Sequence, residues 1–518
     1  MTTQILSGTL TLHPGDSVSI AATDLPAGQV VPGSAGPIRL RQRIESGHKY
    51  ARRAIETGEI VLKYGQAIGR AVAPIAAGEH VHVHNVESLR GRGDLEPQLA
   101  GAGAEAAAPR ITPPTPERLQ DHASRTTHHA PRMLTFQGYR RRDGRVGVRN
   151  HVLVLATVQC ANAVVERIGR DLPQVVALTH EHGCSQIGDD LAQTRRVLEG
   201  FAGHPNVGAV LLVGLGCETM PSVEIAEKLA SSGVICQRLT IQEEGGSRAS
   251  LRRGIAIAGE LLAEAARASS APAPISELIV GVECGGSDGW SGVTANPAVG
   301  VASDLVVRSG GTVILSEVTE FIGAEHLLAA RAADPEIARR IVNATLRREN
   351  AARRLGIDMR GGQPSPGNIA GGLTTIEEKS LGAIAKGGST PIREFVGYAF
   401  RPSVRGLVVM DTPGSDPESV SAMVAGGAQI VVFTTGRGSP VGCPIAPVIK
   451  VCSNSPTHRR LMEDMDLDAG TIVEAGESLA DAGHRIFREI IAVAEGKQTA
   501  AEAWGHREFA IETIGPRL

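Results

Sequence analysis

The sequence predicts an α/β protein in which a small β-rich N-terminal module precedes a larger α/β region with mostly parallel sheets. Short β-type runs separated by Gly and Pro fill residues 1–86. From residue 135 onward, Val, Ile and Leu runs alternate with helical patterns, as in parallel strands that are buried on both faces. Aromatic residues make up 3% and hydrophobic residues 42% of the chain, so Ala, Val, Ile and Leu must form the core.

The 518 residues are too many for a single core. Composition divides the chain into an N-terminal module (1–86), a linker (87–134), an α/β domain (135–390) and a C-terminal α/β domain (391–518). The linker is rich in Ala, Gly, Pro and charged residues and has little apolar pattern. The last boundary follows a break near residues 390–402.

Charge and cysteine usage exclude several classes of protein. The net charge is −3, without the basic stripe of a nucleic-acid binder. No run of 18 apolar residues predicts a membrane span, and no secretory signal is visible. Seven irregularly spaced cysteines favour a reducing compartment over a disulfide framework. We therefore expect a cytoplasmic protein with a small-molecule substrate, and a homodimer is compatible with the sequence.

The N-terminal module is expected to contain the strands VSIAATDL, KYARRAI, EIVLKYG, AIGRAVAPI and HVHVHNV. On a strand, His80, His82 and His84 would share one face, where imidazoles commonly bind a metal. His82 and His84 are favoured because they lie nearer the strand end. The alternative is a polar edge strand whose histidines face water.

Seven apolar strands are predicted in the larger region, at 152–158, 209–216, 277–284, 312–318, 406–411, 429–435 and 448–454. Helical patterns such as 189–202, 221–233 and 418–427 lie between them. Polar residues follow several strands, and ligands of open α/β sheets bind beyond the carboxyl ends of the strands. The candidates at these ends are Cys160, Cys217, Glu218, Cys284, Glu317 and Glu320. For any single cysteine, the alternative is a small buried apolar residue.

The loop Thr179-His180-Glu181-His182-Gly183-Cys184 gathers residue types of metal or acid–base chemistry. No second CxxC or HxxxH lies nearby, so the spacing matches no zinc finger. The alternative is a polar loop with a buried cysteine.

Glycine-rich loops with polar tips, CGGSDGWSG and TTGRGSP, match neither a P-loop nor a dinucleotide-binding fingerprint. Their backbone N–H groups can instead hold carboxylate and hydroxyl oxygens. Arg437, between two glycines, is suited to bind a carboxylate in a fork. The alternative is that these loops are structural turns.

Several longer motifs resemble the altronate/galactarate dehydratase family. They include 138–162, GLGCE (214–218), CGGSDGWSGVTANPAVG (284–300), SEVTEFIGAE (316–325) and VFTTGRGSP (432–440). The N-terminal block, with KYGQAIGRA and HVHVHN, is similar to the SAF module of this family. The resemblance implies a divalent metal, iron(II) or manganese(II), and an elimination that yields a 2-keto-3-deoxy sugar acid. VHVHN and FIGAEHLL favour altronate over galactarate.

Roles follow as hypotheses. The catalytic candidates are His82, His84, His180 and His182. The metal-ligand candidates are His82, His84, Cys184, Cys217, Glu218, Cys284, Glu317 and Glu320. The substrate-binding candidates are Ser287, Asp288, Asn296, Arg437 and Ser439. Lys379 is expected on a helix surface rather than as the base.

Three alternatives stay open. An iron–sulfur cluster on Cys160, Cys184, Cys217 and Cys284 is disfavoured because no clustered spacing requires one. Galactarate or a related hydroxy acid can replace altronate as the substrate. A carbohydrate-binding protein that uses the SAF module as an adaptor is the non-enzymatic reading, and the polar ends of at least five strands count against it.

Overall fold

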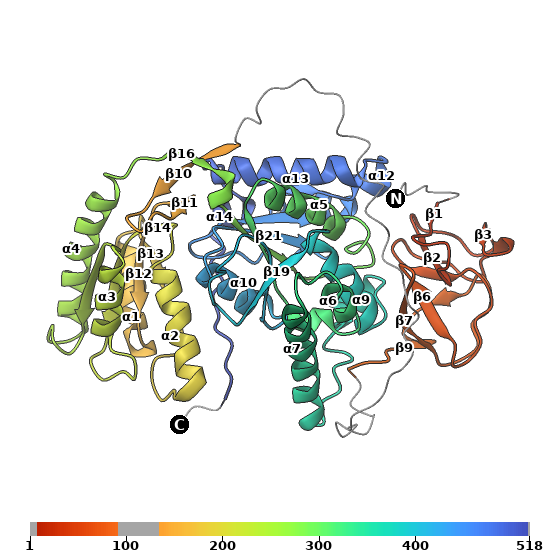
Figure 1. The fold of residues 1–518 in the computed structure, drawn as a ribbon, viewed down its shortest axis with the longest axis horizontal. Coiled ribbons are helices and arrows are strands. Elements are labelled where there is room, and N and C mark those ends of the chain that lie inside the picture. Colours follow the sequence, from red (N-terminus) through yellow and green to blue (C-terminus); the bar gives the residue numbers. More distant parts are fainter. Residues whose placement is uncertain (1–7, 92–133, 516–518) are drawn as a thin grey trace.

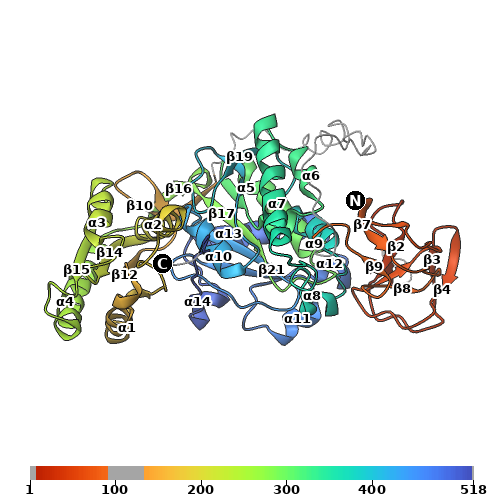
Figure 2. The same cartoon turned by 90° about the horizontal axis from the view of Figure 1, so that it is seen from below.

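The computed structural model describes residues 8–91 and 134–515. Most of the predicted linker therefore lies outside the described residues. Figure 1 shows three parts side by side: the N-terminal module, a central part built on the largest sheet, and a third part built on a smaller parallel sheet. Figure 2 shows the same order from a perpendicular direction.

The N-terminal module consists of short antiparallel strands, which confirms the predicted β-rich module. One sheet has the order β1 (Thr9–Leu10), β2 (Val18–Ala21), β5 (Lys49–Ala51), β8 (His80–Val81). A hairpin joins β3 (Val30–Gly33) to β4 (Gly36–Arg39). A third sheet has the order β6 (Ile60–Lys63), β7 (Gln66–Ala71), β9 (Val86–Glu87).

The part built on the smaller parallel sheet is called the second domain below. Its four parallel strands have the order β13 (Val176–Leu178), β12 (His151–Ala156), β14 (Val207–Gly214), β15 (Cys236–Thr240). Its helices are α1 (Asn162–Asp171), α2 (Gly188–Ala202), α3 (Ser222–Ser231) and α4 (Ser247–Ala265). The small antiparallel sheet β11 (Val146–Gly147), β10 (Thr135–Arg140), β16 (Ala271–Pro274) connects it to the central part.

The central part contains a seven-stranded parallel sheet. Its order is β19 (Ile392–Val396), β20 (Gly406–Met410), β18 (Thr312–Leu315), β17 (Ile279–Cys284), β21 (Ile430–Thr435), β22 (Val448–Cys452), β23 (Leu467–Asp468). Residues of α5 (Ala295–Arg308) and α13 (Leu479–Ala494) share an apolar core with one face of this sheet. Residues of α10 (Asp416–Ala425) and of α2 share a core with the other face.

The remaining helices pack around the central part. They are α6 (Glu325–Ala329), α7 (Pro335–Arg354), α8 (Pro366–Ala370), α9 (Ile376–Ala383), α11 (Ser455–Arg460), α12 (Thr471–Glu474) and α14 (Ala500–Trp504). Short 3₁₀ turns are η2 (Gln159–Ala161), η3 (Ile275–Glu277), η4 (Val318–Phe321) and η5 (Ile384–Gly387).

All seven strands predicted in the larger region are confirmed, with ends that differ by a few residues. The three helical patterns quoted above correspond to α2, α3 and α10. The expected break near 390–402 contains β19, so strands from both sides of residue 390 share one sheet, and the boundary at 390 stays a prediction. Within 8–91 and 134–515, no helix is both long and apolar enough to cross a bilayer.

Candidate active site

Buried ion pairs join the N-terminal module to the central part. Nζ of Lys49 and Nζ of Lys63 lie 3.0 and 2.8 Å from Oε1 of Glu378 on α9, and all three side chains are at most 1% exposed. Burial raises the pKa of Glu378, but the two ammonium groups outweigh it and hold this pKa well below its usual range. Lys49 also donates to the carbonyl oxygen of Gly372 at 2.6 Å. The module is therefore held in one position against the central part.

Four imidazoles of the module gather beside these ion pairs. Nδ1 of His48 lies 3.0 Å from Nε2 of His80. The ring centroid of His82 lies 5.2 Å from that of His48 and 5.1 Å from that of His80, and His84 stands 5.6 Å from His80. Nε2 of His82 is 3.0 Å from the carbonyl oxygen of Ile369 in the central part. The imidazoles thus face loops of the central part.

A turn, and not a strand, brings these rings together. β8 ends at Val81, so the predicted strand through His84 is wrong. Asn85 closes the turn: its amide N–H donates to the His82 carbonyl, and its side-chain oxygen accepts from the His82 N–H at 2.9 Å. Its Nδ2 donates to the His80 carbonyl at 2.9 Å. An Asn side chain that bonds its own turn in this way is a common device for closing it.

His48 was missed by the sequence analysis. It directly precedes β5, and the antiparallel pairing of β5 with β8 places Tyr50 opposite His80. The only sequence signal was a single histidine at the start of the predicted strand KYARRAI. Pairing of distant strands was needed to bring it to the other three rings.

The environment favours the neutral form of His48, His80 and His82. Burial lowers the pKa of His80 to about 3 and that of His82 to about 4, with the neighbouring imidazoles and Lys49 adding to the shifts. Burial also lowers the pKa of His48. Because a neutral imidazole has a lone pair on one ring nitrogen, these rings are able to accept a proton or to bind a metal at pH 7.

A cavity of about 400 Å³ lies between the module and the central part, next to His48. This volume is in the usual range for a small-molecule site. Arg437 projects from between two glycines at its wall, and its guanidinium donates to no side chain or carbonyl in the described part of the chain. Lining residues from the module are Asp24, Arg43, Glu45, Ser46 and His48; those from the central part include Asp288, Trp290, Gly371, Arg437, Ser453, Asn454 and Thr457.

Asp288 shapes this cavity. Its Oδ1 accepts from the Ser291 N–H at 2.9 Å and from Oγ of Ser453 at 2.7 Å, and its Oδ2 accepts from Nδ2 of Asn454 at 2.8 Å. The carboxylate therefore fastens the loop after β17 to the loop after β22. Its lone pairs are largely used inside the protein, so Asp288 positions the wall of the cavity.

The other three substrate-binding candidates do not line the cavity. Asn296, on α5, accepts from Oγ1 of Thr434 at 2.6 Å and donates to the Gly382 carbonyl at 3.0 Å. Ser287 is 3% exposed, and its hydroxyl has no hydrogen-bond partner among the described residues. Ser439 is half-buried beyond Arg437.

A buried acid–lysine network lies at the carboxyl edge of the large sheet. Nζ of Lys386 is 2.6 Å from Sγ of Cys284 and 2.5 Å from Oε2 of Glu317. Nζ of Lys379 is 2.6 Å from Oε1 of Glu320, whose Oε2 accepts from Cys284 Sγ at 3.0 Å. Lys379, expected on a helix surface, is therefore largely buried. Within the described residues, Cys284, Glu317 and Glu320 are the one trio of His, Cys or acidic side chains whose ligand atoms all lie within 4.8 Å of one another.

Glu317 is the most unusual member of this network. Its φ of 69° lies in the left-handed region, which is strained for a residue with a Cβ. Burial, followed by the charge of Glu320, raises its pKa to about 7. Its Oε1 is buried without a partner among the described residues. Burial and the neighbouring carboxylate thus favour the protonated form of Glu317.

The remaining predicted residues lie in the second domain, on the far side of the central part from the N-terminal module (Figures 1 and 2). Nε2 of His180 is 2.7 Å from the Ala156 carbonyl, and Nδ1 of His182 is 3.3 Å from Nε2 of Gln186. Oε2 of Glu218 accepts from the N–H of Gly216 at 2.6 Å. The predicted metal ligands thus fall into three separate places and cannot share one ion.

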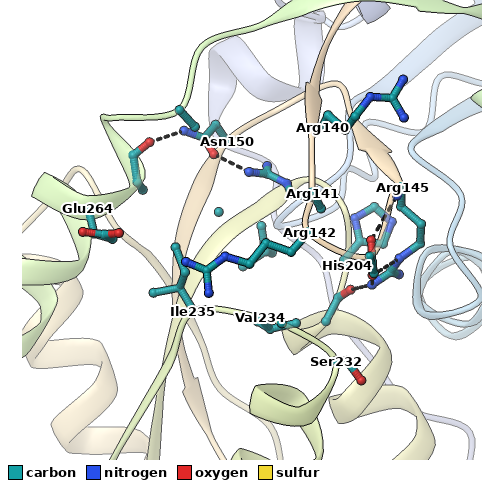
Figure 3. Close-up of a pocket in the computed structure, with 17 residues that line it drawn as sticks. Arg140, Arg141, Arg142, Arg145, Asn150, His204, Ser232, Val234, Ile235 and Glu264 are labelled. Atoms are coloured by element: carbon teal, nitrogen blue, oxygen red, sulfur yellow. Dashed lines mark hydrogen bonds and ion pairs between the residues drawn. The ribbon is translucent and has the colours of Figure 1, made fainter.

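A second cavity, of about 170 Å³, lies beside β10 in the second domain and has four arginines in its wall (Figure 3). Arg141 donates to Oδ1 of Asn150 at 2.8 Å and to two backbone carbonyls. Arg145 donates to Asp143, and both ring nitrogens of His204 are bonded to the backbone. Arg141, Arg145 and His204 therefore hold loops together.

Comparison with known families gives matches along the chain. Residues 7–89 match the altronate/galactarate dehydratase SAF domain. Residues 138–266 match the second domain of D-galactarate dehydratase/altronate hydrolase, and residues 275–517 match the C-terminal domain of D-galactarate/altronate dehydratase.

Three curated relatives extend over nearly the whole chain. The chain is 36% identical to an altronate dehydratase of Escherichia coli (strain K12) and 34% identical to one of Bacillus subtilis (strain 168), over 98% of this chain and 99% of each relative. It is 34% identical to a galactarate dehydratase (L-threo-forming) of Escherichia coli (strain K12), over 98% of this chain and 96% of the relative.

Proposed function

Because the chain belongs to the altronate/galactarate dehydratase family and is an enzyme of that family, a hydro-lyase, we propose that it removes water from altronate to give 2-keto-3-deoxygluconate. The observation that carries this proposal is the cavity between the module and the central part. It combines a neutral imidazole, His48, with the guanidinium of Arg437, which has no partner among residues 8–91 and 134–515. An elimination from a hydroxy acid needs a base and a cation for the carboxylate, and these two groups supply them.

The chemistry begins at a weakly acidic C–H bond. Removing the C2 proton places negative charge on the neighbouring carboxylate, and Arg437 stabilises that charge through paired hydrogen bonds. The His48–His80 pair, with nitrogens 3.0 Å apart, accepts the proton. The protonated pair returns a proton to the C3 hydroxyl, which leaves as water. The enol that remains tautomerises to the 2-keto acid.

The family resemblance implies iron(II) or manganese(II). Two groups of side chains are candidates to bind such an ion. The imidazoles of His82 and His84, beside His48 and His80, are nitrogen donors suited to these ions, and burial holds the pKa of His82 at about 4. Bound there, the ion would act as a Lewis acid that lowers the pKa of the C2 proton.

The trio Cys284, Glu317 and Glu320 fits a divalent ion less well. Nζ of Lys386 and Nζ of Lys379 already occupy the space beside its sulfur and carboxylate oxygens. A divalent ion would have to displace a buried ammonium group, which is costly. We therefore propose that the imidazoles of His82 and His84 supply two ligands of the ion, since no three imidazole nitrogens of the described residues lie within 4.8 Å of one another.

Galactarate is the second candidate, since the galactarate dehydratase relative is nearly as similar. An aldarate has a carboxylate at each end, whereas the cavity offers one unpaired guanidinium. The cavity wall has one other arginine, Arg43 of the module, and its guanidinium is paired with Asp24 at 2.5 Å. This difference favours a substrate with one carboxylate.

The test is an assay of the full chain with iron(II) or manganese(II) and a panel of aldonates and aldarates, in which 2-keto acid is measured. We expect altronate to be consumed fastest, and His48→Ala to lower kcat at least about 100-fold. His484→Ala, a change at an exposed histidine of α13, is the matched control and should keep full activity. Full turnover in His48→Ala with an unchanged melting temperature would show that this cavity does not take part in the reaction.

A further inference from the structure

Three of the seven cysteines are exposed, and all three belong to one edge of the second domain. Cys160, Cys184 and Cys217 are exposed free thiols, whereas the other four are buried or half-buried. Free cysteines are among the most buried residues in proteins, so three exposed ones in one domain call for an explanation. They follow β12, β13 and β14, which are adjacent parallel strands, so they emerge at the same edge of the sheet.

Backbone hydrogen bonds bind the three cysteine loops to one another. The N–H of Gln159, next to Cys160, donates to the His182 carbonyl at 2.9 Å. The N–H of Thr219, two residues after Cys217, donates to the Gly183 carbonyl at 3.1 Å. The loop that contains Cys184 is therefore bonded to both of the others.

Glycines beside two of the cysteines allow this close approach. Gly183 has φ +96°, and a Cβ there would stand 2.3 Å from the carbonyl oxygen of Thr157. Gly216 has φ +118°, and a Cβ there would stand 2.6 Å from Oε1 of Gln242. Each glycine directly precedes a cysteine, Cys184 or Cys217. The local backbone is thus shaped to present these thiols at the sheet edge.

The surroundings do not suit a nucleophilic thiol. In the described part of the chain, the polar contacts of these sulfurs are Ser185 Oγ with Cys184 at 3.8 Å and Gln242 Nε2 with Cys217 at 3.8 Å. No lysine, arginine or histidine is bonded to them, and a reactive thiolate usually has such a neighbour. Cysteine thiolates are also the ligands of zinc and of iron–sulfur clusters.

The three thiols are too far apart for a single ion. Their sulfur atoms do not form a trio within 4.8 Å, the separation at which the Cys284 trio is found. An iron–sulfur cluster bridges a larger gap because each thiolate binds a different iron atom. We propose that Cys160, Cys184 and Cys217 bind a [4Fe–4S] cluster whose fourth iron has no cysteine ligand and is open to a non-cysteine ligand such as water or a hydroxy acid.

This site differs from the four-cysteine cluster that the sequence analysis disfavoured. Cys284 belongs to the buried network of the large sheet and donates to Glu320 there. The second domain also lies on the opposite side of the central part from the imidazole cluster (Figures 1 and 2). The proposed cluster is therefore independent of the cavity next to His48.

The test is an anaerobic preparation of the full chain, reconstituted with iron(II) and sulfide and then desalted. We expect about four iron and four acid-labile sulfide atoms per chain, a brown colour and a cluster signal in Mössbauer spectra. Cys160→Ser, Cys184→Ser and Cys217→Ser should each lose at least half of the labile sulfide while keeping the wild-type melting temperature, because all three side chains are exposed.

Cys236→Ser, a change on β15 of the same sheet, is the matched control and should keep the full cluster. Wild-type protein that retains less than about one labile sulfide per chain, or that binds zinc but no sulfide, would overturn the proposal. So would a cluster that survives in all three serine variants. None of these results depends on turnover. A failure of this proposal can therefore be distinguished from a failure of the altronate assay.

Discussion

The guanidinium of Arg437 can bind a ligand because the loop that carries it is held by its own backbone hydrogen bonds. Gly436 and Arg437 both donate backbone N–H bonds to the Gly286 carbonyl, so the loop after β21 is fixed while the guanidinium stays unpaired. A fixed backbone with a free side chain is what a carboxylate-binding residue requires, since little order must be gained on binding.

We predict that Arg437→Lys raises KM for the sugar acid about tenfold, because an ammonium group cannot form the paired hydrogen bonds of a guanidinium. Steady-state kinetics measures this change. Arg252→Lys, at an exposed position of α4, is the control and should leave KM unchanged. An unaltered KM in Arg437→Lys would place Arg437 outside the substrate site.

Lys450 offers a prediction about stability. Its ammonium nitrogen is fully buried, lacks a hydrogen-bond partner among the described residues and stands 3.5 Å from the centroid of the Phe433 ring. Burial lowers its pKa from 10.5 to about 7. Unfolding therefore takes up a proton between pH 7 and 10.5, and the wild type gains stability as the pH rises through this window.

Lys450→Met should stabilise the fold by about 1 kcal/mol or more near pH 7, since a buried charge is replaced by an apolar chain of similar volume. The difference from wild type should shrink toward about pH 9, where the folded lysine is already neutral. Urea unfolding at the two pH values measures both effects. Destabilisation at the lower pH would show that the charge of Lys450 is compensated in the fold.

At the scale of elements, α9 links the buried Lys49–Lys63–Glu378 ion pairs to the buried acid–lysine network. Glu378 accepts from the module's Lys63, and the next residue, Lys379, pairs with Glu320 of the acid network. One helix of eight residues therefore contacts both the module and the carboxyl edge of the large sheet.

Glu378→Gln should lower the free energy of unfolding by about 3–5 kcal/mol, because Lys49 and Lys63 are left as buried unpaired charges. Trp290, which packs against Leu10 and Ile20 of the module, should become more exposed to quenchers of its fluorescence. Glu418→Gln, a change in the first turn of α10, is the control. Stability equal to wild type in Glu378→Gln would mean that these ion pairs do not hold the module.

Five of the seven strands of the large sheet could be predicted because each is an apolar run of four to six residues bounded by turns, as in Ile430–Thr435. β19 and the two-residue β23 were not predicted. The turn after Val81 could not, because His80, Val81, His82 and Val83 alternate as in a strand. The closing hydrogen bonds of Asn85 decide the conformation there. Short edge strands such as Val176–Leu178 were also missed, since three residues give little pattern.

At the scale of the whole molecule, the sequence indicated which residue types carry chemistry but not which of them meet. His48 and Arg437 are separated by almost 400 positions and share one cavity wall only because the module docks on the carboxyl edge of the large sheet. Conversely, His82 and His182 have similar sequence surroundings and lie in different parts of the molecule. Long-range docking of this kind leaves no local sequence pattern.

The most direct measurement is the position of a bound, unreactive sugar acid in an experimental structure of the full chain. The account predicts density in the cavity between the module and the central part, with the carboxylate on Arg437 and C2 facing His48. Density in the arginine-lined cavity of the second domain, or an empty cavity at a concentration that saturates inhibition, would contradict it.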